Sequence, residues 1–260
     1  MFSIITPVRN AVGTIERTLD SVAEQAVALE HLVLDAASTD GTLDLLEARR
    51  DSFAYFRSEA DAGIAAAFNE GIRAAHGDYV LFLNADDYLL PGALVQVRRA
   101  LDAGVDADIV YGDIQVIDRD GHAFVERADH TLLHRYMSLH HPAMLFRREL
   151  LSALGGYDEA YRLAMDSELV HRAIAQGASL QRVDEVVAAM ARGGLSDRYH
   201  LESLWEYRRS AVRHGLSGRL SSLAYFVRQT LVHVALQVPG VRDWRLARRA
   251  AVSPDRAAGR

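Results

Sequence analysis

The chain has 260 residues, of which 50% are hydrophobic and 25% are charged, and this composition is ordinary for a globular protein. It contains no cysteine, which excludes disulfides, cysteine nucleophiles, zinc–thiolate sites and iron–sulfur clusters. All 29 of its basic residues are arginine, so a lysine-containing phosphate loop and Schiff-base catalysis are excluded as well.

The charge is distributed unevenly along the chain. Residues 1–197 hold 17 Arg and 31 acidic residues, whereas residues 198–260 hold 12 Arg and 4 acidic residues. The net charge of −6 therefore divides into −14 and +8. A basic segment on an acidic body predicts contact with an anionic partner. For residues 201–213 we expect helices packed on the core, with arginines in water or paired with the acidic body. For residues 217–249 contact with an anionic membrane surface is the alternative to such packing.

The N-terminal residues lack the basic and apolar regions of a targeting signal, and no apolar run approaches the roughly 18 residues of a membrane span. We therefore expect a cytoplasmic protein, bound peripherally at the inner face of the membrane if the basic helices contact lipid. Nucleic acid is not an expected partner, because the body is acidic and no recognised binding motif accompanies the arginines.

Short apolar runs alternate with helical spacing in the first hundred residues. Strands are predicted at 3–5, 31–35, 53–57 and 79–83, and helices at 12–22, 42–50, 64–75 and 91–101. Further along, the sequence predicts a hairpin at 108–118 and 123–127, a strand at 143–147, and helices at 166–176 and from 199 onward. This β-α order indicates a mainly parallel sheet with helices on both faces.

Polar residues follow each of the first four predicted strands. Asp35, Asp61 and the pair Asp86–Asp87 stand at three of these ends, where ligands bind in open α/β sheets. Helix capping is the alternative explanation, since Asp, Asn, Ser and Thr are the preferred N-caps. Adjacent carboxylates behind a buried strand also repel one another and need a cation or a hydrogen-bond donor nearby. A Mg²⁺ or Mn²⁺ ion that bridges a nucleotide diphosphate meets this need.

Six segments in order carry a resemblance to a known family. They are Ser3–Asn10, Asp35–Thr42, Ser58–Ile64, Phe82–Asp87, Gly155–Leu169 and Gly193–Ser196. Together they resemble the family-2 glycosyltransferases with the GT-A fold, over about residues 2–197. The resemblance implies a single α/β, GT-A-like Rossmann-type domain with a mixed, mainly parallel sheet, and a C-terminal helical extension. Its boundaries would be 1–107 for the nucleotide-sugar half, 108–197 for the acceptor half and 198–260 for the basic extension.

The resemblance also implies roles for individual residues. The family's nucleotide and donor contacts fall on Thr6, Pro7, Arg9, Asp35, Asp61, Gly63, Asn69, Asn84 and Asp86. Asp87 falls on the metal ligand of the Asp-x-Asp-type motif, which implies Mn²⁺ or Mg²⁺ as cofactor. Asp166 falls on the catalytic base of an inverting transfer. Ala36 and Met165 depart from the pattern, since many members carry an acidic residue at each of these positions.

The chemistry of glycosyl transfer agrees with the roles of the two aspartates. Direct displacement at an anomeric carbon needs one base on the acceptor side and a cation on the leaving diphosphate. Asp166 also has the position of a helix N-cap, which is compatible with catalysis. His140 and His141 precede the strand predicted at 143–147, and acceptor contact and a buried structural histidine are both open for them.

The expected function is transfer of a sugar from a nucleotide-diphosphate sugar, with a UDP-sugar favoured, to a saccharide or lipid-linked saccharide acceptor. A hexosyl- or N-acetylhexosaminyl-transferase in polysaccharide or glycolipid assembly is the implied type. A non-catalytic nucleotide-sugar-binding or scaffolding protein of the same fold is the alternative. A sugar nucleotidyltransferase is disfavoured, because it needs a glycine-rich N-terminal loop and usually a lysine, and the chain has neither.

Overall fold

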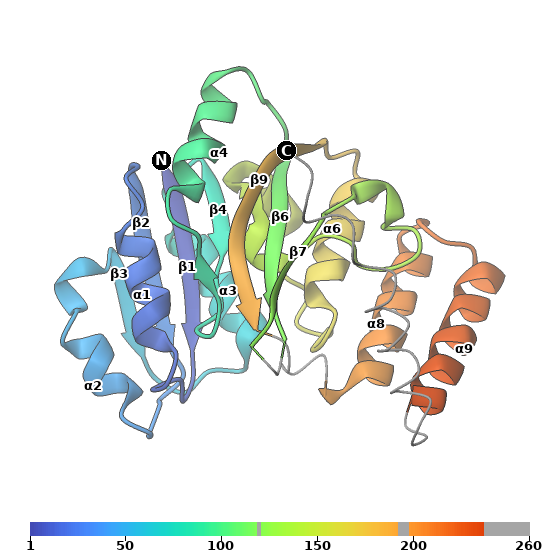
Figure 1. Ribbon diagram of the computed structural model, residues 1–260, viewed down its shortest axis with the longest axis horizontal. Helices are drawn as coiled ribbons and strands as arrows, with labels where there is room; N and C mark the ends of the chain where they lie inside the picture. The colour runs from blue at the N-terminus through green and yellow to red at the C-terminus, as the bar shows by residue number, and fades with distance from the viewer. Residues whose placement is uncertain (119–120, 192–197, 237–260) are drawn as a thin grey trace.

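The computed structural model describes residues 1–118, 121–191 and 198–236. Its centre is a nine-stranded sheet in the order β3-β2-β1-β4-β8-β6-β9-β5, with β7 paired to β6 (Figure 1). The strands are β1 Phe2–Val8, β2 Leu29–Asp35, β3 Tyr55–Ser58, β4 Tyr79–Phe82, β5 Tyr88–Leu89, β6 Ile109–Ile117, β7 Ala123–Glu126, β8 Met144–Arg147 and β9 Leu180–Ala191. The α-helices are α1 Ile15–Ala23, α2 Thr42–Glu47, α3 Ile64–Ala74, α4 Ala93–Asp102, α5 Arg148–Leu154, α6 Met165–Ala175, α8 His200–Arg213 and α9 Arg219–Leu236.

Side-chain alternation buries both faces of the parallel half of the sheet, which is formed by β1 to β4. Ile5 and Leu34 pack on the face covered by α3, α5 and α6. Ile4 packs with α4 on the opposite face, and Val8 and Val33 pack there with α1 and α2. Because successive residues of a strand point to opposite faces, helices on both sides require nearly continuous apolar strands. The predicted parallel arrangement with two helical layers is confirmed.

Two of the predicted helices begin two or more residues later than the sequence pattern indicates. The helix predicted at 12–22 begins only at Ile15, and Val12 lies before it with an exposed side chain. The helix predicted at 91–101 begins at Ala93, because Gly92 has a φ of 72° and so lies outside the helical region.

The second half of the sheet is mixed. β8 runs antiparallel to both β4 and β6, while β9 runs parallel to β6 and antiparallel to β5. The predicted hairpin is confirmed as β6 and β7. The pairing of β6 with β9 is irregular around Gly112, where an added Cβ would lie 2.6 Å from the carbonyl oxygen of Glu185. Glycine at this position therefore permits the close approach of the two strands.

The C-terminal helices α8 and α9 pack beside the mixed half of the fold, on the right of Figure 1. α8 contacts α6 through Tyr207 and Ala211, which form a small apolar cluster with Ala164. α9 packs against α8, and the rings of Trp205 and Phe226 meet edge to face at 5.5 Å. None of the helices in the described residues is both long enough and apolar enough to cross a membrane.

Candidate active site

The carboxyl ends of β1, β2 and β3 meet at one edge of the sheet, because Val8 pairs with Asp35 and Asp35 pairs with Ser58. Asp35 is fully buried there. Its carboxylate accepts hydrogen bonds from the backbone N–H of Ser38 at 3.1 Å, from the Ser38 hydroxyl, and from the Ser58 hydroxyl at 2.6 Å. The chain therefore satisfies this carboxylate itself, and Asp35 holds the loop after β2 against β3.

The residues predicted at the end of β1 have different environments. Thr6 is buried, and its hydroxyl lies 2.9 Å from Nε2 of His31. Burial lowers the pKa of His31 to about 3, so this imidazole is neutral at physiological pH. Pro7 is also buried, beyond Ile5, where the pairing of β1 with β4 ends. A residue without an N–H is tolerated there, because β1 has a neighbour on one side only. Arg9 is exposed at the same edge.

Asp61 and Gly63 form the turn that leads into α3. The backbone N–H of Gly63 donates to the Asp61 carboxylate at 2.9 Å, and Gly63 has a φ of 119° that favours glycine. The other oxygen of Asp61 lies 3.7 Å from Arg57. The Arg57 guanidinium also donates to Glu70 at 2.9 Å, so an ion-pair network fixes this turn.

Asn69 lies in α3 and binds the acceptor half of the chain. Its side-chain NH₂ donates to the Tyr157 carbonyl at 3.0 Å, and its side-chain oxygen accepts from the Tyr157 N–H at 2.7 Å. Gly156 lies directly against this amide with a φ of +76°, and a Cβ there would collide with Asn69. The Asn69 amide is thus hydrogen-bonded to backbone of the Gly155–Glu159 segment, and its donor role remains a prediction.

Asp86 and Asp87 follow β4 and differ sharply in burial. Asp86 is exposed, whereas Asp87 is 2% exposed and its carboxylate accepts one long hydrogen bond, 3.3 Å from Asn84 Nδ2. Burial raises the pKa of Asp87 well above its usual range, and the negative charges of Asp86 and Asp166 raise it further. The loop itself is fixed, because the Thr18 hydroxyl contacts the carbonyl oxygen of Asp87 at 2.7 Å.

Asp166 lies in the first turn of α6, and its burial raises the pKa of its carboxyl group. Its Oδ1 atom is buried without a hydrogen-bond partner among the described residues and lies 3.4 Å from Nε2 of His141. The same His141 nitrogen is hydrogen-bonded to the Tyr157 hydroxyl at 2.8 Å. Burial lowers the pKa of His141 and raises that of Tyr157 well above its usual range, so both groups favour their neutral forms.

Phe82 joins the two halves of this site. The His141 ring stacks on Phe82 at 5.4 Å with an angle of 5° between the ring planes. Phe82 is the last residue of β4, the strand that leads into Asp87. The structure therefore brings Asp87, His141 and Asp166 together around one strand end. The side chain of His140 is half-buried at the start of the short 3₁₀ turn His141–Ala143.

The site has the donor atoms for a divalent cation but not a complete protein cage. Among the described residues, no group of three or more His, Asp or Glu side chains is placed to hold a metal. Mg²⁺ and Mn²⁺ usually take one or two carboxylates and complete their coordination with phosphate and water. The buried, poorly compensated carboxylate of Asp87, next to Asp86 and near Asp166, fits this requirement.

Several side chains that contact the predicted site residues were not themselves predicted from the sequence. Tyr157, Phe82, Ser38 and Ser58 each contact a predicted site residue. Tyr157 follows a Gly-Gly pair in the Gly155–Leu169 segment, which is one of the segments that resemble the family. This location is the sequence signal that could have indicated Tyr157 as a site residue. The predicted Gly193–Ser196 loop lies outside the described residues.

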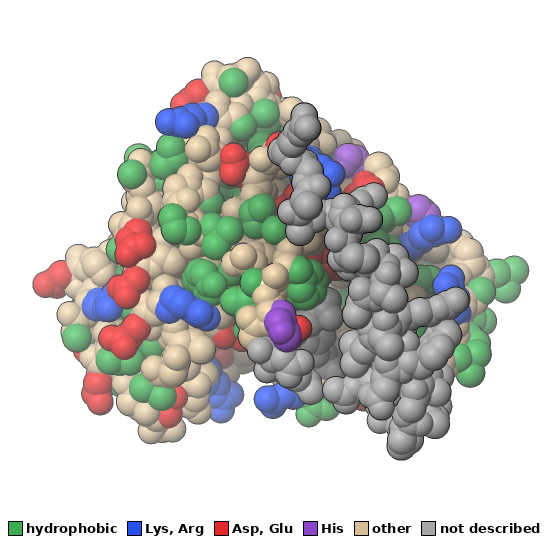
Figure 2. Space-filling model, viewed as in Figure 1, with side chains coloured by type: hydrophobic (Ala, Val, Ile, Leu, Met, Phe, Trp, Pro, Cys, Tyr) green, Lys and Arg blue, Asp and Glu red, His purple; other side chains and the backbone are tan. Residues whose placement is uncertain are grey.

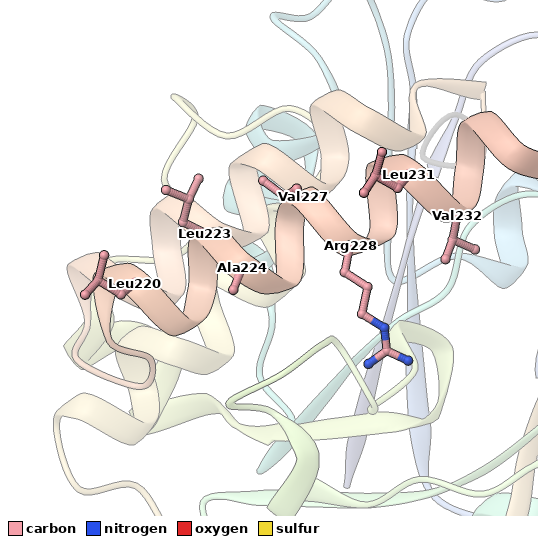
Figure 3. Close-up of a pocket in the computed structure, with 7 residues that line it drawn as sticks. All are labelled: Leu220, Leu223, Ala224, Val227, Arg228, Leu231 and Val232. Atoms are coloured by element: carbon pink, nitrogen blue, oxygen red, sulfur yellow. The ribbon is translucent and has the colours of Figure 1, made fainter.

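An apolar groove of about 640 Å³ lies apart from these residues, along α9 (Figure 3). It is lined by Leu220, Leu223, Ala224, Val227, Arg228, Leu231 and Val232. Hydrophobic side chains gather on the same edge of the molecule in the space-filling view (Figure 2). None of the lining residues belongs to the predicted active site.

A mixed sheet with parallel N-terminal strands and carboxylates at their ends defines a GT-A-type glycosyltransferase fold, and solved structures confirm it. The GT-A-like α/β fold class predicted from the sequence is therefore correct. One similar structure is S. aureus TarS 1-349 in complex with UDP-GlcNAc, which has a TM-score of 0.64, 19% identity and coverage of 86% of this chain and 70% of that one. Another is the mannosyltransferase PcManGT from Pyrobaculum calidifontis in complex with GDP-Man and Mn²⁺, with a TM-score of 0.65, 22% identity and coverage of 97% and 80%.

The sequence comparisons identify the family. Residues 3–162 match the family described as glycosyl transferase family 2, and the chain belongs to this family. It is 34% identical over 207 residues to a PGL/p-HBAD biosynthesis glycosyltransferase of Mycobacterium bovis, covering 76% of this chain and 79% of that protein. It is also 32% identical over 195 residues to the O-antigen biosynthesis protein RfbC of Myxococcus xanthus, covering 71% of this chain and 15% of that protein. The chain is thus a glycosyltransferase.

Proposed function

We propose that this glycosyltransferase moves a hexosyl or N-acetylhexosaminyl group from a nucleotide-diphosphate sugar to an acceptor hydroxyl with inversion, and that Asp166 is the base. The observation that carries the proposal is the buried Asp166 Oδ1, which accepts no hydrogen bond from the described residues and lies near the strand end that bears Asp87. A UDP-sugar is the favoured donor, in keeping with the UDP-GlcNAc bound by the S. aureus structure.

The reaction follows from these positions. Asp166 removes the acceptor hydroxyl proton while the acceptor oxygen attacks the anomeric carbon. The new carbon–oxygen bond forms on the side opposite the diphosphate. The bond from the anomeric carbon to the diphosphate breaks, and the diphosphate leaves with the electron pair. Burial raises the pKa of Asp166 and makes it a stronger base than an exposed carboxylate. The His141 imidazole lies beside this carboxylate, with Nε2 3.4 Å from Oδ1.

A divalent cation, Mn²⁺ or Mg²⁺, would be held by Asp87 with Asp86 beside it. When bound, it supplies positive charge to the departing diphosphate. Thr6, Pro7, Asp35, Asp61, Gly63 and Asn84 would shape the nucleotide site at the carboxyl edge of the sheet, and Arg9 is the exposed cation there. The relatives are named for PGL/p-HBAD and O-antigen biosynthesis, in keeping with a saccharide or lipid-linked saccharide acceptor.

We further propose that α9 binds peripherally to the cytoplasmic face of an anionic membrane. Leu220 and Leu231 are 84% and 65% exposed on the apolar stripe, and Arg228 lines the same groove. Apolar side chains flanked by arginine suit an interface with anionic headgroups. Sedimentation with vesicles should require phosphatidylglycerol and weaken in the Leu220→Ser/Leu231→Ser variant. Equal sedimentation with pure phosphatidylcholine would contradict the proposal.

The test of the enzymatic proposal compares binding with turnover. UDP, GDP, dTDP and CDP are each added with Mn²⁺, and a nucleotide that binds the folded state raises the melting temperature. Asp166→Asn should keep that shift and lose nucleotide release from the matching nucleotide sugar. Unchanged turnover in Asp166→Asn would refute the assignment of the base. Nucleotide binding without turnover in the wild type would favour the non-catalytic alternative.

A further inference from the structure

The start of α6 is anchored by a carboxylate from outside the predicted α/β domain. Glu206 in α8 accepts hydrogen bonds from the backbone N–H groups of Arg162 at 3.1 Å, Leu163 at 2.8 Å and Ala164 at 2.9 Å. These three amides precede Met165, the first residue of α6. A carboxylate at a helix N-terminus also interacts favourably with the helix dipole.

This anchor lies close in sequence to the proposed base. Ala164 is the N-cap residue of α6, and its own side chain makes no capping hydrogen bond to the helix. Asp166 follows two residues later. A single carboxylate that accepts three N–H groups fixes the direction in which the chain enters the helix, because charged hydrogen bonds are short and directional. The position of Asp166 relative to β4 therefore depends on the contact from α8.

Two further contacts hold α8 along the rest of α6. His171, fully buried in α6, is hydrogen-bonded through Nδ1 to the Ser210 hydroxyl at 2.9 Å. Glu168 of α6 lies 3.1 Å from Nε2 of His214, the residue that follows α8, and pairs with Arg172 at 2.7 Å. α8 and the residue after it thus contact the chain just before α6, at Glu168 and at His171, and Glu206 makes the contact at the entry to the helix.

We infer that Glu206 is a positioning residue for Asp166, so that α8 forms part of the catalytic unit and is not only an appendage. This inference rests on the proposed role of Asp166. Removal of the charge weakens the three hydrogen bonds, because bonds to an ionised acceptor are roughly twice as strong as neutral ones. The entry to α6 then loosens, and the base moves away from the acceptor hydroxyl. A displacement of about 1 Å at a catalytic group costs up to about 100-fold in rate. The nucleotide site at the ends of β1 to β4 does not include α8 and keeps its affinity.

The experiment uses Glu206→Gln and Glu206→Asp, with Glu202→Gln as the matched control. Glu202 is exposed in the first turn of the same helix, so its substitution removes the same charge without touching the 162–164 amides. Nucleotide release from UDP-N-acetylglucosamine and from GDP-mannose is measured with Mn²⁺, with water as acceptor. Hydrogen exchange at the 162–164 amides is measured on the same proteins.

For Glu206→Gln we expect kcat to fall by about 10- to 100-fold, with the donor KM changed less than about twofold and faster exchange at residues 162–164. Glu206→Asp keeps the charge on a shorter side chain, and its kcat should lie between those of the wild type and Glu206→Gln. The kcat of Glu202→Gln should match that of the wild type. Wild-type kcat in Glu206→Gln despite faster exchange would overturn the inference, as would an equal loss in Glu202→Gln. If the wild type itself releases no nucleotide, the proposed function fails; unchanged exchange in Glu206→Gln refutes the anchor alone.

Discussion

Two buried aspartates, at the ends of strands that flank β1 on either side, have opposite environments. Asp35, at the end of β2, accepts hydrogen bonds from the Ser38 backbone and from the hydroxyls of Ser38 and Ser58. Asp87, after β4, accepts one hydrogen bond at 3.3 Å and faces other carboxylates. Both aspartates follow the ends of buried strands, so the supply of hydrogen-bond donors distinguishes the carboxylate that the protein satisfies from the one that it satisfies poorly.

The surrounding loops extend this difference. The loop after β1 is tied to the loop after β2, since the Asn10 N–H donates to the Ser38 hydroxyl at 2.8 Å and the Thr39 N–H donates to Asn10 Oδ1 at 2.9 Å. The carboxylate of Asp87 instead lies close to the charges of Asp86 and Asp166, and Asp166 Oδ1 lies 3.4 Å from Nε2 of His141. The first region is thus held by its own hydrogen bonds, and the carboxylates of the second region receive few.

The largest expected effect is on Asp87→Asn. The substitution replaces a buried carboxyl group whose charged form is disfavoured and which accepts one long hydrogen bond, from Asn84, so the ligand-free protein should unfold at the same or a higher temperature. We expect Mn²⁺-dependent stabilisation by nucleotide to disappear and turnover to fall by at least about 100-fold. Calorimetry with and without Mn²⁺ and a nucleotide-release assay measure both. A clear loss of ligand-free stability would show that Asp87 is structural.

The same substitution at Asp35 should act in the opposite way. In Asp35→Asn the amide cannot accept all of the hydrogen bonds that the carboxylate accepts, and one donor is left buried without a partner. We expect a loss of about 2–4 kcal/mol in the free energy of unfolding. Urea unfolding of Asp35→Asn and Asp87→Asn under one set of conditions makes the comparison. Equal stability of the two variants would remove the distinction.

His31 allows a pH test of the complete region. Its pKa is about 3 in the folded protein and about 6.5 when unfolded, so below pH 6.5 the unfolded chain binds a proton that the folded chain does not. Stability from this residue is therefore lost as the pH falls from 6.5 toward 3, by up to about 1.4 kcal/mol per unit. At pH 7.5 His31→Gln should have a lower free energy of unfolding than the wild type. This difference should become smaller at pH 5.5, because only the wild type loses stability through protonation of His31. Parallel urea-unfolding profiles would contradict the burial of a neutral imidazole.

The smallest expected effect is on Asp86→Asn. Asp86 is exposed and raises the pKa of its buried neighbour Asp87 by repulsion. Its removal should stabilise the ligand-free protein by no more than about 0.5 kcal/mol, as is usual for surface substitutions. Thermal unfolding at pH 7.5 measures this difference, with Asp102→Asn as an exposed control on α4. Destabilisation in Asp86→Asn alone would mean that the carboxylate has a structural partner.

The parallel half of the fold follows from local sequence patterns, and the rest depends on long-range packing. Apolar runs and helical spacing predict β1 to β4, because each element buries its own periodic face. β9 escaped prediction, since its burial shows no regular alternation along Leu180–Ala191. Spacing alone cannot show that Tyr157 meets His141 or that Glu206 reaches the start of α6, more than 40 residues away in sequence.

The hydrogen bonds between Asn69 and Tyr157 also bear on protein engineering. Both donor and acceptor groups of the Asn69 amide bind the backbone of one residue, Tyr157, in the segment before α6, and Gly156 packs against the amide. A chimera that takes residues 1–107 from one relative and the rest of the chain from another would have to inherit this amide and its glycine as a matched set. The junction would lie in the chain between α4 and β6.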